Sequence, residues 1–319
     1  MKKILFITDD LNNFKIKTDS TYFLILTAIE SNYHVFISTP NSIYSIDNNV
    51  YTRCSLLIGQ QKSTAIPDMN SKWHELQQND ILNLNNFYAI FVRNDPPFNM
   101  EYYYLTQMLE IASNRFKIKI INSGSALRNC NEKLSILNFP TLITSTLVSK
   151  DYQAIYQFLE QHQDCVIKPI DMMAGIGVFK LSINDVNHHV ILESSTKNFT
   201  QTVMIQKFIP EVKLGDKRIF IINDTIIDQC LCRIPSNNQI RGNLAAGGNG
   251  IVCPITSNDQ NIAKQIIPWM RTNNIYYAGI DVIGNYLTEI NITSPTGMRQ
   301  IFDVSNINIP QIIINTISH

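Results

Sequence analysis

The sequence predicts an α/β protein, in which a doubly wound N-terminal unit precedes a second region built mainly from short strands. Over the first 122 residues, short apolar runs alternate with segments of helical spacing, the pattern of a sheet with helices on its faces. From about residue 123, short strands predominate. The 319 residues exceed what one hydrophobic core usually holds, so we expect two or three packed units.

The elements of the N-terminal unit can be assigned in order. The spacing predicts strands at 4–8, 34–39, 89–92 and 119–121, a hairpin at 43–58, and helices at 18–31 and 100–113. The strand at 89–92 ends in Arg93-Asn-Asp95-Pro-Pro97, where the prolines stop the strand and stiffen its exit. No glycine-rich dinucleotide fingerprint follows the first strand, and the chain contains no P-loop motif.

The second region is predicted to contain six strands, one hairpin and three helices. The strands fall at 141–145, 165–170, 177–182, 202–208, 217–223 and 226–234, the hairpin at 278–293, and the helices at 150–161, 257–272 and 308–317. No internal repeat or low-complexity tract interrupts this order.

The charge balance excludes several classes of function. The 26 Lys and Arg residues equal the 26 Asp and Glu residues, and no basic stripe favours nucleic acid. No apolar stretch approaches a membrane span, and the apolar run at the N-terminus is too short for a signal peptide. We therefore expect a cytoplasmic enzyme without a nucleic-acid or membrane partner, which meets any anionic ligand with local cations or a metal.

Six cysteines are scattered along the chain without any C-x-x-C pair: Cys54, Cys130, Cys165, Cys230, Cys232 and Cys253. Cys230 and Cys232 would share one face of a strand. Core packing of reduced thiols is favoured over a metal or redox role.

The hairpin near the C-terminus carries polar residues where a buried strand should be apolar. Glu289 and Asn291 are two positions apart and share a face, and Asp281 lies on the other strand. Two carboxylates and an amide are hard oxygen ligands of the kind that Mg²⁺ takes together with substrate phosphates. Burying two carboxylates without a cation is costly. These residues therefore predict a Mg²⁺ site, and the alternative is a solvent-facing hairpin.

The metal site also predicts the register of this hairpin. A regular two-residue turn at Gly284-Asn285 would set Asp281 opposite Thr288 and turn Glu289 to the other face. For Asp281 and Glu289 to share a face, the hairpin must contain one more residue between them. We therefore predict a three-residue loop or a β-bulge that sets Asp281 opposite Glu289. Gly284 or Asn285 should take the positive φ that the turn needs.

Two lysines are candidates for binding phosphates. Lys168 ends an apolar strand, and the small-residue loop 171–177 behind it could cover phosphates with backbone N–H groups. The alternative is an ordinary hairpin with a surface lysine. Lys133 offers a second cation near a helix start, although such runs are more often solvated faces.

Three arginines lie on or beside strands that are otherwise apolar: Arg218, Arg233 and Arg241. Arginine fits carboxylate and phosphate with two parallel hydrogen bonds, so with the metal hairpin they indicate phosphoryl chemistry on an acid. The alternative is a set of unrelated surface ion pairs. The strand end at 206–210 suits the edge of an adenine ring, and without other support it is better interpreted as a buried strand terminus.

Six motifs stand in order along nearly the whole chain: Val92-Arg-Asn-Asp-Pro-Pro-Phe98, Leu127-Arg-Asn-Cys-Asn-Glu-Lys-Leu134, Gly215-Asp-Lys-Arg218, Arg233-Ile-Pro235, Arg241-Gly-Asn-Leu-Ala-Ala-Gly-Gly248 and Leu287-Thr-Glu-Ile-Asn-Ile-Thr-Ser-Pro-Thr296. Together they resemble bacterial glutathione synthetase, an ATP-grasp carboxylate–amine ligase of glutathione biosynthesis. Each motif is modest evidence alone, and the ordered set is specific.

The resemblance implies a domain plan and a reaction. It implies an N-terminal α/β domain at 1–122, a central ATP-grasp lid at 123–200 and a C-terminal ATP-grasp domain at 201–319, with the ATP-grasp module at about 133–318. ATP would phosphorylate the cysteinyl carboxylate of γ-glutamylcysteine, and the amine of glycine would attack the acyl phosphate. Mg²⁺, with Mn²⁺ as a possible substitute, would assist, and the family resemblance also implies a homotetramer.

The resemblance further assigns roles to residues. It implies catalytic roles for Arg233, Arg218 and Arg241, and metal binding by Asp281, Glu289 and Asn291. It implies ATP binding by Lys133, Lys168, Asp171, Met173, Gly175, Gln206, Lys207, Phe208, Ile209 and Asp216. It implies substrate binding by Asp19, Ser20, Arg93, Asp95, Asn243, Gly247, Gly248, Ser294, Pro295 and Thr296.

The chain departs from the family pattern at five positions: Met172 and Ala174 where more glycine is expected, Asn249 for an arginine, Gln300 for a carboxylate, and Gly297 for a bulkier residue. These departures concern flap mobility and affinity rather than the reaction. Two rival functions are another ATP-grasp ligase, which joins D-alanine units or adds glutamate to a peptide end, and an ATP-binding regulatory module without catalysis. The motif at 92–98 and the Arg241 loop favour glutathione synthetase.

Overall fold

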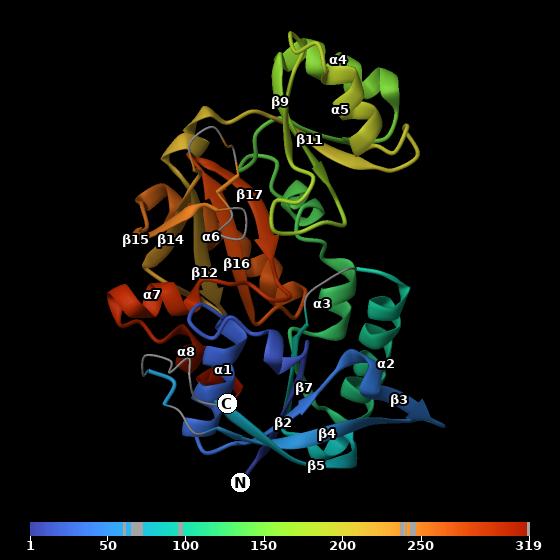
Figure 1. Ribbon diagram of the computed structural model, residues 1–319, viewed down its shortest axis with the longest axis vertical. Helices are drawn as coiled ribbons and strands as arrows, with labels where there is room; N and C mark the ends of the chain where they lie inside the picture. Colours follow the sequence, from blue (N-terminus) through green and yellow to red (C-terminus); the bar gives the residue numbers. More distant parts are fainter. Residues whose placement is uncertain are drawn as a thin grey trace.

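The structure is a computed structural model, and it describes residues 1–59, 62–64, 73–94, 98–236, 239, 241–242 and 247–317. Three units follow one another along its long axis (Figure 1). The N-terminal unit lies at one end, the C-terminal sheet in the middle, and a smaller central unit at the other end. The α/β class predicted from the sequence is confirmed.

The N-terminal unit is built on a mixed sheet in the order β3-β4-β2-β1-β6-β7, with β5 paired to β4. Its strands are β1 (Lys3–Thr8), β2 (His34–Ser38), β3 (Ile43–Ile46), β4 (Asn49–Gly59), β5 (His74–Asn83), β6 (Ala89–Arg93) and β7 (Lys119–Ile121). Strands β2, β1, β6 and β7 are parallel, and β4 joins them antiparallel. The parallel strands and the 43–58 hairpin were predicted, and β5 was not.

Helices cover both faces of the parallel strands, which confirms the doubly wound arrangement. Helix α1 (Ser20–Glu30) packs on the face that carries Ile4 and Phe6. Helix α2 (Met100–Phe116) packs on the face of Leu5 and Ile7, with α3 (Gly124–Asn129) beside it. Because successive strand residues point to opposite faces, one apolar run supplies both cores. Across the described residues, the short 3-10 helices are Leu11–Asn13, Pro40–Ser42, Leu84–Asn86, Leu134–Asn138 and Pro210–Leu214.

The central unit is a four-stranded antiparallel sheet in the order β10-β9-β11-β8, with two helices. Its elements are β8 (Thr146–Ser149), α4 (Tyr152–His162), β9 (Asp164–Pro169), β10 (Phe179–Ser182), α5 (His188–Ser195) and β11 (Val203–Lys207). Its apolar core is separate from the other cores of the described residues. Strand β11 lies beyond residue 200 yet pairs with β9 and β8. We therefore propose that this unit extends to residue 207.

One strand predicted for this region is wrong. Residues 141–145 form turns, and the strand begins only at Thr146. The apolar Leu142 instead packs in the core of the C-terminal unit, where its carbonyl accepts a hydrogen bond from the backbone N–H of Leu287 (2.8 Å). The sequence pattern detected a buried segment, and the burial is against the hairpin rather than within a sheet.

The C-terminal unit is a sheet in the order β15-β14-β12-β16-β17, with β13 paired to β12. Its elements are β12 (Asp216–Ile222), β13 (Thr225–Ile226), β14 (Gln229–Ile234), β15 (Asn249–Pro254), α6 (Ser257–Thr272), β16 (Tyr277–Ile283), β17 (Tyr286–Asn291), α7 (Met298–Ser305) and α8 (Ile309–Ile317). Helix α6 packs on one face, and α7 and α8 pack on the other. The predicted hairpin and the helices at 257–272 and 308–317 are confirmed.

The N- and C-terminal units share one continuous core, to which α1, α7 and α8 all contribute. Asn122 joins them further, since its side chain donates to the carbonyls of Tyr277 (2.8 Å) and Ile292 (2.6 Å) and accepts from the N–H of Tyr276 (2.7 Å). The carboxyl end of β7 is thereby fixed against the C-terminal hairpin. No described helix is both long enough and apolar enough to cross a membrane.

Candidate active site

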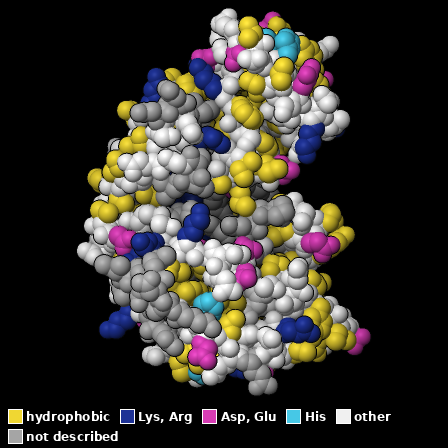
Figure 2. Space-filling model, in the orientation of Figure 1, with side chains coloured by type: hydrophobic (Ala, Val, Ile, Leu, Met, Phe, Trp, Pro, Cys, Tyr) yellow, Lys and Arg dark blue, Asp and Glu magenta, His cyan; other side chains and the backbone are white. Residues whose placement is uncertain are grey.

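A cavity of about 690 Å³ lies where the three units meet. Figure 2 shows the surface hollowed beneath the central unit. Its cationic lining residues are Lys15, Lys133, Lys168, Lys207, Arg218, Arg233 and Arg241, and its carboxylates are Asp19, Glu132, Asp216 and Glu289. Seven cations against four carboxylates favour an anionic ligand, although the chain as a whole carries no net charge.

The hairpin of β16 and β17 brings the predicted metal residues to one face. The turn is the two-residue Gly284-Asn285, with φ of 57° at Gly284. Val282 pairs with Leu287 and Asp281 pairs with Glu289, so the register shifts by one residue at a bulge. The shared face, the bulge and the positive φ at Gly284 are confirmed, and the three-residue loop is wrong.

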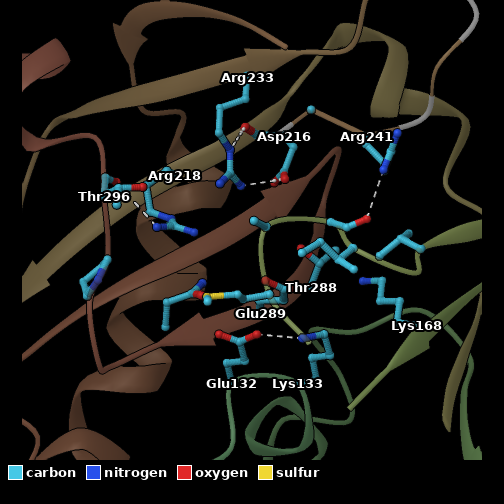
Figure 3. Close-up of a pocket in the computed structure, with 18 of the residues that line it drawn as sticks. Glu132, Lys133, Lys168, Asp216, Arg218, Arg233, Arg241, Thr288, Glu289 and Thr296 are labelled. Atoms are coloured by element: carbon cyan, nitrogen blue, oxygen red, sulfur yellow. Dashed lines mark hydrogen bonds and ion pairs between the residues drawn. The ribbon is translucent and has the colours of Figure 1, made fainter. Parts of the chain in front are cut away.

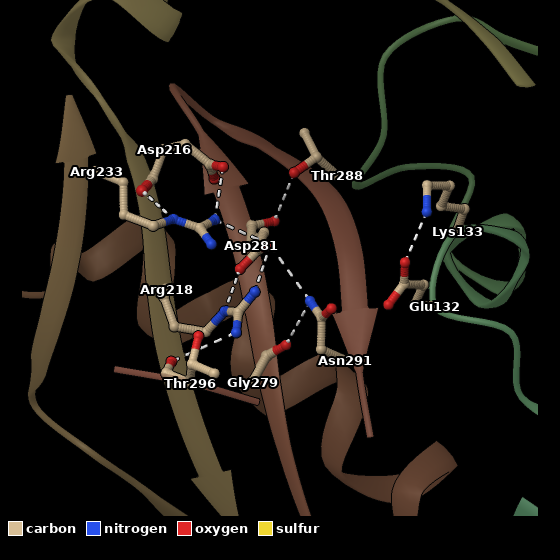
Figure 4. A network of polar contacts seen from close by, with 10 residues as sticks. All are labelled: Glu132, Lys133, Asp216, Arg218, Arg233, Gly279, Asp281, Thr288, Asn291 and Thr296. Carbon is tan, nitrogen blue, oxygen red and sulfur yellow. Dashed lines mark hydrogen bonds and ion pairs between the residues drawn. The ribbon is translucent and has the colours of Figure 1, made fainter. Parts of the chain in front are cut away.

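Asp281 is held by two arginines (Figure 4). It is 2% exposed, accepts from Nε (2.5 Å) and Nη2 (2.9 Å) of Arg218, and pairs with Nη2 of Arg233 at 2.9 Å. Arg233 also donates to Oδ2 of Asp216 at 2.6 Å. Both oxygens of Asp281 are therefore engaged behind the cavity wall, while Glu289 and Asn291 line the cavity itself.

Strand register explains this network. Arg218 on β12 lies directly opposite Asp281 on β16, and Asp216 lies directly opposite Arg233 on β14. Opposed residues of an antiparallel pair project to the same side, so the sheet itself pairs the charges. Burial alone would raise the pKa of Asp281, but the two guanidinium groups outweigh it and lower that pKa.

The pKa of Asp216 shifts in the opposite direction to that of Asp281, although the two carboxylates share these surroundings. Burial is the main cause and raises its pKa to about 6, although Arg233 lowers that pKa in part, and repulsion from Asp281 and Glu289 adds to the rise. Its Oδ1 is buried without a hydrogen-bond partner in the part of the chain that the structure describes. The site thus keeps a free buried acceptor beside the cavity.

Glu132 lies beside the metal hairpin, where it pairs with Lys133 (2.6 Å) and repels Glu289. Burial raises the pKa of Glu132, and repulsion from Glu289 raises it further. Burial works against the charge of Lys133, but Glu289 and Glu132 together outweigh it and raise its pKa. Two carboxylates that repel each other beside the Asn291 amide are a donor set suited to a hard divalent cation, so these residues fit Mg²⁺.

The loop 171–177, which we call the flap, forms one wall of the cavity (Figure 3). Lys133 Nζ donates to the carbonyl of Met172 (2.5 Å), and Arg241 donates to the carbonyl of Gly175 (3.5 Å). Gly177 has φ of 71°, and a Cβ there would lie 2.7 Å from Pro169 Cγ. Glycine is therefore required where the flap returns to the strand.

The N-terminal unit closes the opposite end of the cavity. Asp19 lines it and caps α1, accepting from the N–H groups of Thr21 (2.7 Å) and Tyr22 (2.8 Å). Burial raises the pKa of Asp19, although Arg93 nearby lowers it in part. The loop after the first parallel strand thus delivers a carboxylate to the site, as expected at the carboxyl ends of parallel strands.

Two residues predicted to bind substrate, Arg93 and Ser20, lie behind the cavity lining and do not line it themselves. Arg93 is 3% exposed and donates to Tyr277 Oη (3.0 Å) and to the carbonyl of Pro295 (3.5 Å). Ser20 Oγ accepts from the N–H groups of Gly297 and Met298. Both side chains hold the 293–298 turn in place.

The structure brings most predicted site residues to the cavity. Those that line it are Asp19, Lys133, Lys168, Met173, Gly175, Gln206, Lys207, Phe208, Ile209, Asp216, Arg218, Arg233, Arg241, Glu289, Asn291, Ser294, Pro295 and Thr296. Ser20, Arg93, Asp171, Gly247, Gly248 and Asp281 do not line it, and Asp95 and Asn243 lie outside the described residues.

Sequence reasoning missed Asn13, Lys15, Thr18 and Glu132, and named Gln300 only as a departure. The loop that follows the first parallel strand is where ligands of such sheets bind, so this position could have indicated Lys15.

Gly297 has φ of 112°, and a Cβ there would lie 3.0 Å from Leu231 Cδ2. The glycine is therefore a requirement of this turn.

Solved structures share this fold over their full length. A RiPP-associated ATP-grasp ligase from Chryseobacterium gregarium, solved with ADP and a leader and core peptide, has a TM-score of 0.65 at 17% identity and covers 100% of this chain and 97% of its own. A D-cycloserine synthetase has a TM-score of 0.65 at 10% identity, covering 99% and 98%. The ATP-grasp ligase PsnB, solved with Mg and ADP, has a TM-score of 0.60 at 13% identity, covering 99% and 97%. The fold is that of ATP-grasp ligases.

Sequence comparison narrows this class to one family. The model of the prokaryotic glutathione synthetase N-terminal domain matches residues 2–128, and the model of its ATP-grasp domain matches residues 132–306. Glutathione synthetase of Nitrosomonas europaea is 38% identical, covering 99% of this chain and 97% of its own length, and that of Buchnera aphidicola is 38% identical, covering 99% and 96%. The chain belongs to the prokaryotic glutathione synthetase family, and is thus an ATP-dependent ligase.

Proposed function

We propose that this chain joins γ-glutamylcysteine to glycine through a cysteinyl acyl phosphate. The terminal phosphoryl group of ATP passes to the peptide carboxylate, the glycine amine attacks the acyl carbon, and phosphate leaves, giving glutathione, ADP and phosphate. The observation that carries this proposal is the cationic cavity between the flap and the paired arginines. Closure of the flap would keep water from the acyl phosphate, and the fixed cations would stabilise the charge that develops on it.

The nucleotide would lie on the side of the central unit. Lys133 and Lys168 suit the α and β phosphates, and the flap offers backbone N–H groups around Met173 and Gly175. The edge of the adenine ring would contact residues 206–209, at the end of β11. Buried Gln206 supports that wall, since its Nε2 donates to Thr146 Oγ1 (3.0 Å). The free Oδ1 of Asp216 would accept from a nucleotide hydroxyl, and exposed Asp171 would act only after flap movement.

Glu289 and Asn291 would bind Mg²⁺ directly, since both line the cavity. When bound there, the cation would neutralise charge that develops on the transferred phosphoryl group. Asp281 would contribute through the arginines it holds, and would become a ligand only if they release it. Mn²⁺ prefers similar oxygen ligands and would substitute.

Arg233 and Arg218 would stabilise the tetrahedral intermediate of acyl transfer. Their guanidinium groups are fixed by Asp281 and Asp216, so they need little reorganisation when charge develops. Arg241 would reach the same anion from the connection between β14 and β15, which it shares with the proposed substrate residues Asn243, Gly247 and Gly248.

The peptide would occupy the end next to the N-terminal unit. Asp19 and Lys15 offer opposite charges for a zwitterionic γ-glutamyl group, and the 294–296 turn suits the acceptor end. Arg93 and Ser20 would position that turn, and Asp95 is proposed as a further peptide contact. A homotetramer, proposed from the family resemblance, would be checked by light scattering after size-exclusion chromatography.

A substrate screen tests the proposal against its rivals. ADP release should require γ-glutamylcysteine and glycine together. A ligase for D-alanine units or for glutamate addition would instead respond to those substrates, and a regulatory module would bind ATP without turnover. Turnover with another amine or peptide in preference to this pair would overturn the proposed function.

A further inference from the structure

Two thiols outside the active site face each other across neighbouring strands. Cys230 on β14 lies directly opposite Cys253 on β15, and their Sγ atoms are 3.5 Å apart. Cys230 is 0% exposed, Cys253 is partly exposed, and both are free thiols. The prediction of core packing is confirmed for Cys230, but the direct pairing with Cys253 was not foreseen.

The backbone at this pair suits a disulfide. Directly opposed residues of an antiparallel pair have Cα atoms about 4.5 to 5.5 Å apart. Disulfides span Cα separations of about 4.4 to 6.8 Å, so a bond here needs no shift of either strand. Cys232 shares this face but lies opposite Ile251, so its relation to Cys253 is diagonal.

The two strands that carry the pair also carry active-site groups. Arg233 follows Cys230 by three residues on β14, and its guanidinium holds Asp216 and Asp281. The connection from β14 to β15 includes Arg241, which lines the cavity and reaches the flap carbonyl of Gly175. A covalent bond between the strands would restrict the base of this connection.

We propose that Cys230 and Cys253 form a thiol–disulfide exchange site for a small-molecule disulfide, namely the oxidised form of the product, and that closing it slows ligation. The identity of that disulfide and the effect on rate rest on the proposed function, whereas the pairing of the two thiols does not. Ligation would then slow when much of the product is present as glutathione disulfide.

The exchange balances without a further reactant. The more exposed Cys253 thiolate attacks one sulfur of glutathione disulfide, whose S–S bond breaks and releases one glutathione thiolate. Cys230, as thiolate, then attacks the Cys253 sulfur of the mixed disulfide and releases the second glutathione. Two electrons pass from the protein thiols to the small disulfide, and two protons go to solvent or the released thiolates. Burial raises the pKa of Cys230, so the second step should quicken as pH rises.

The experiment uses the full chain with graded mixtures of glutathione and glutathione disulfide, quenched by alkylation and digested for peptide mass analysis. We expect a Cys230–Cys253 linked peptide, a several-fold loss of ligase kcat, and recovery with dithiothreitol. Cys253→Ser should abolish both effects. Cys232→Ser, on the same strand face, should retain them, and thermal melts would establish that both variants fold, with Cys253→Ala as the second variant.

Three outcomes would overturn the proposal: no linked peptide in pure glutathione disulfide, a link from Cys232 to Cys253 instead, or a complete link with an unchanged ligase rate. The linked peptide is detected without any assay of ligation. A protein that forms the link but makes no glutathione would therefore contradict the proposed function and leave the thiol pairing established.

Discussion

The floor and the flap of the cavity are held in place by different kinds of interaction. The floor, formed by β12, β14, β16 and β17, holds Arg218 and Arg233 at 5% exposure each. They pair across the strands with buried Asp281 and partly buried Asp216. The flap exposes Met172 by 42% and Ile176 by 56%, and main-chain carbonyls make its contacts with Lys133 and Arg241. Sheet pairing fixes the floor, whereas replaceable hydrogen bonds hold the flap.

The proposed reaction needs a rigid floor and a movable flap. Charge stabilisation requires donors that are already in place, and removing one partner of a buried ion pair costs about 3–5 kcal/mol, so the floor strongly favours one arrangement. The carbonyl of Met172 accepts a hydrogen bond from Lys133, which is a proposed phosphate ligand. A phosphate can therefore replace the flap on this lysine, which couples nucleotide binding to movement of the flap.

The largest effect should come from the metal hairpin on the floor. Glu289→Gln should lower the ligase rate by about 100-fold or more at limiting Mg²⁺, because even outer-shell partners of metals cost about 10- to 100-fold. Steady-state kinetics over a Mg²⁺ titration measure this. Glu193→Gln on α5, away from the cavity, is the matched control. A full rate for Glu289→Gln at limiting Mg²⁺ would remove Glu289 from the metal site.

Arg233→Ala should act on turnover rather than on ATP affinity, since its role is in the transition state. We expect kcat to fall about 100- to 1000-fold, as when one donor to a developing oxyanion is lost. Kinetics and calorimetric titration with an ATP analogue separate the two quantities. Equal losses in both, or a loss in ATP affinity alone, would place Arg233 in nucleotide binding instead.

The flap should become protected when ligands bind, and the floor should not change. We expect slower hydrogen exchange and proteolysis at 171–177 once an ATP analogue and γ-glutamylcysteine are both present. The segment 236–250, for which ordering is also predicted, lies partly outside the described residues, and the same experiment tests it. Unchanged exchange at 171–177 with both ligands would contradict the distinction between flap and floor.

A smaller effect should appear in the pH dependence of stability. Because the pKa of Asp216 is raised to about 6 in the folded state, the folded state binds this proton more tightly than the unfolded state. Stability from this group is therefore present at pH 4 and falls as pH rises towards 6, by up to about 3 kcal/mol. Urea unfolding of Asp216→Asn should show a flatter profile than the parent between pH 4 and 6. An identical slope in both would contradict the raised pKa.

The sequence predicted those parts of the molecule that depend on local pattern. The apolar runs located the parallel strands and β16. The spacing of Asp281, Glu289 and Asn291 required either a three-residue loop or a bulge, and the hairpin contains the bulge. Strand β5 was missed because its sequence, HELQQNDILN, is mostly polar and lacks an apolar alternation.

Long-range pairing could not be predicted in the same way. The engagement of Asp281 by two arginines depends on the register of β12 against β16 and of β14 against β12, which no local pattern specifies. Likewise, the direct opposition of Cys230 and Cys253 follows from the pairing of β14 with β15, across a connection whose length the sequence leaves open.

The most direct test of the account follows oxygen through the reaction. γ-Glutamylcysteine labelled with ¹⁸O in the cysteinyl carboxylate is incubated with ATP, glycine and the enzyme, and the phosphate product is analysed by mass spectrometry. If the carboxylate is phosphorylated and glycine then displaces phosphate, one ¹⁸O from the peptide appears in each phosphate released. Phosphate without the label, formed while glutathione accumulates, would contradict the acyl-phosphate route.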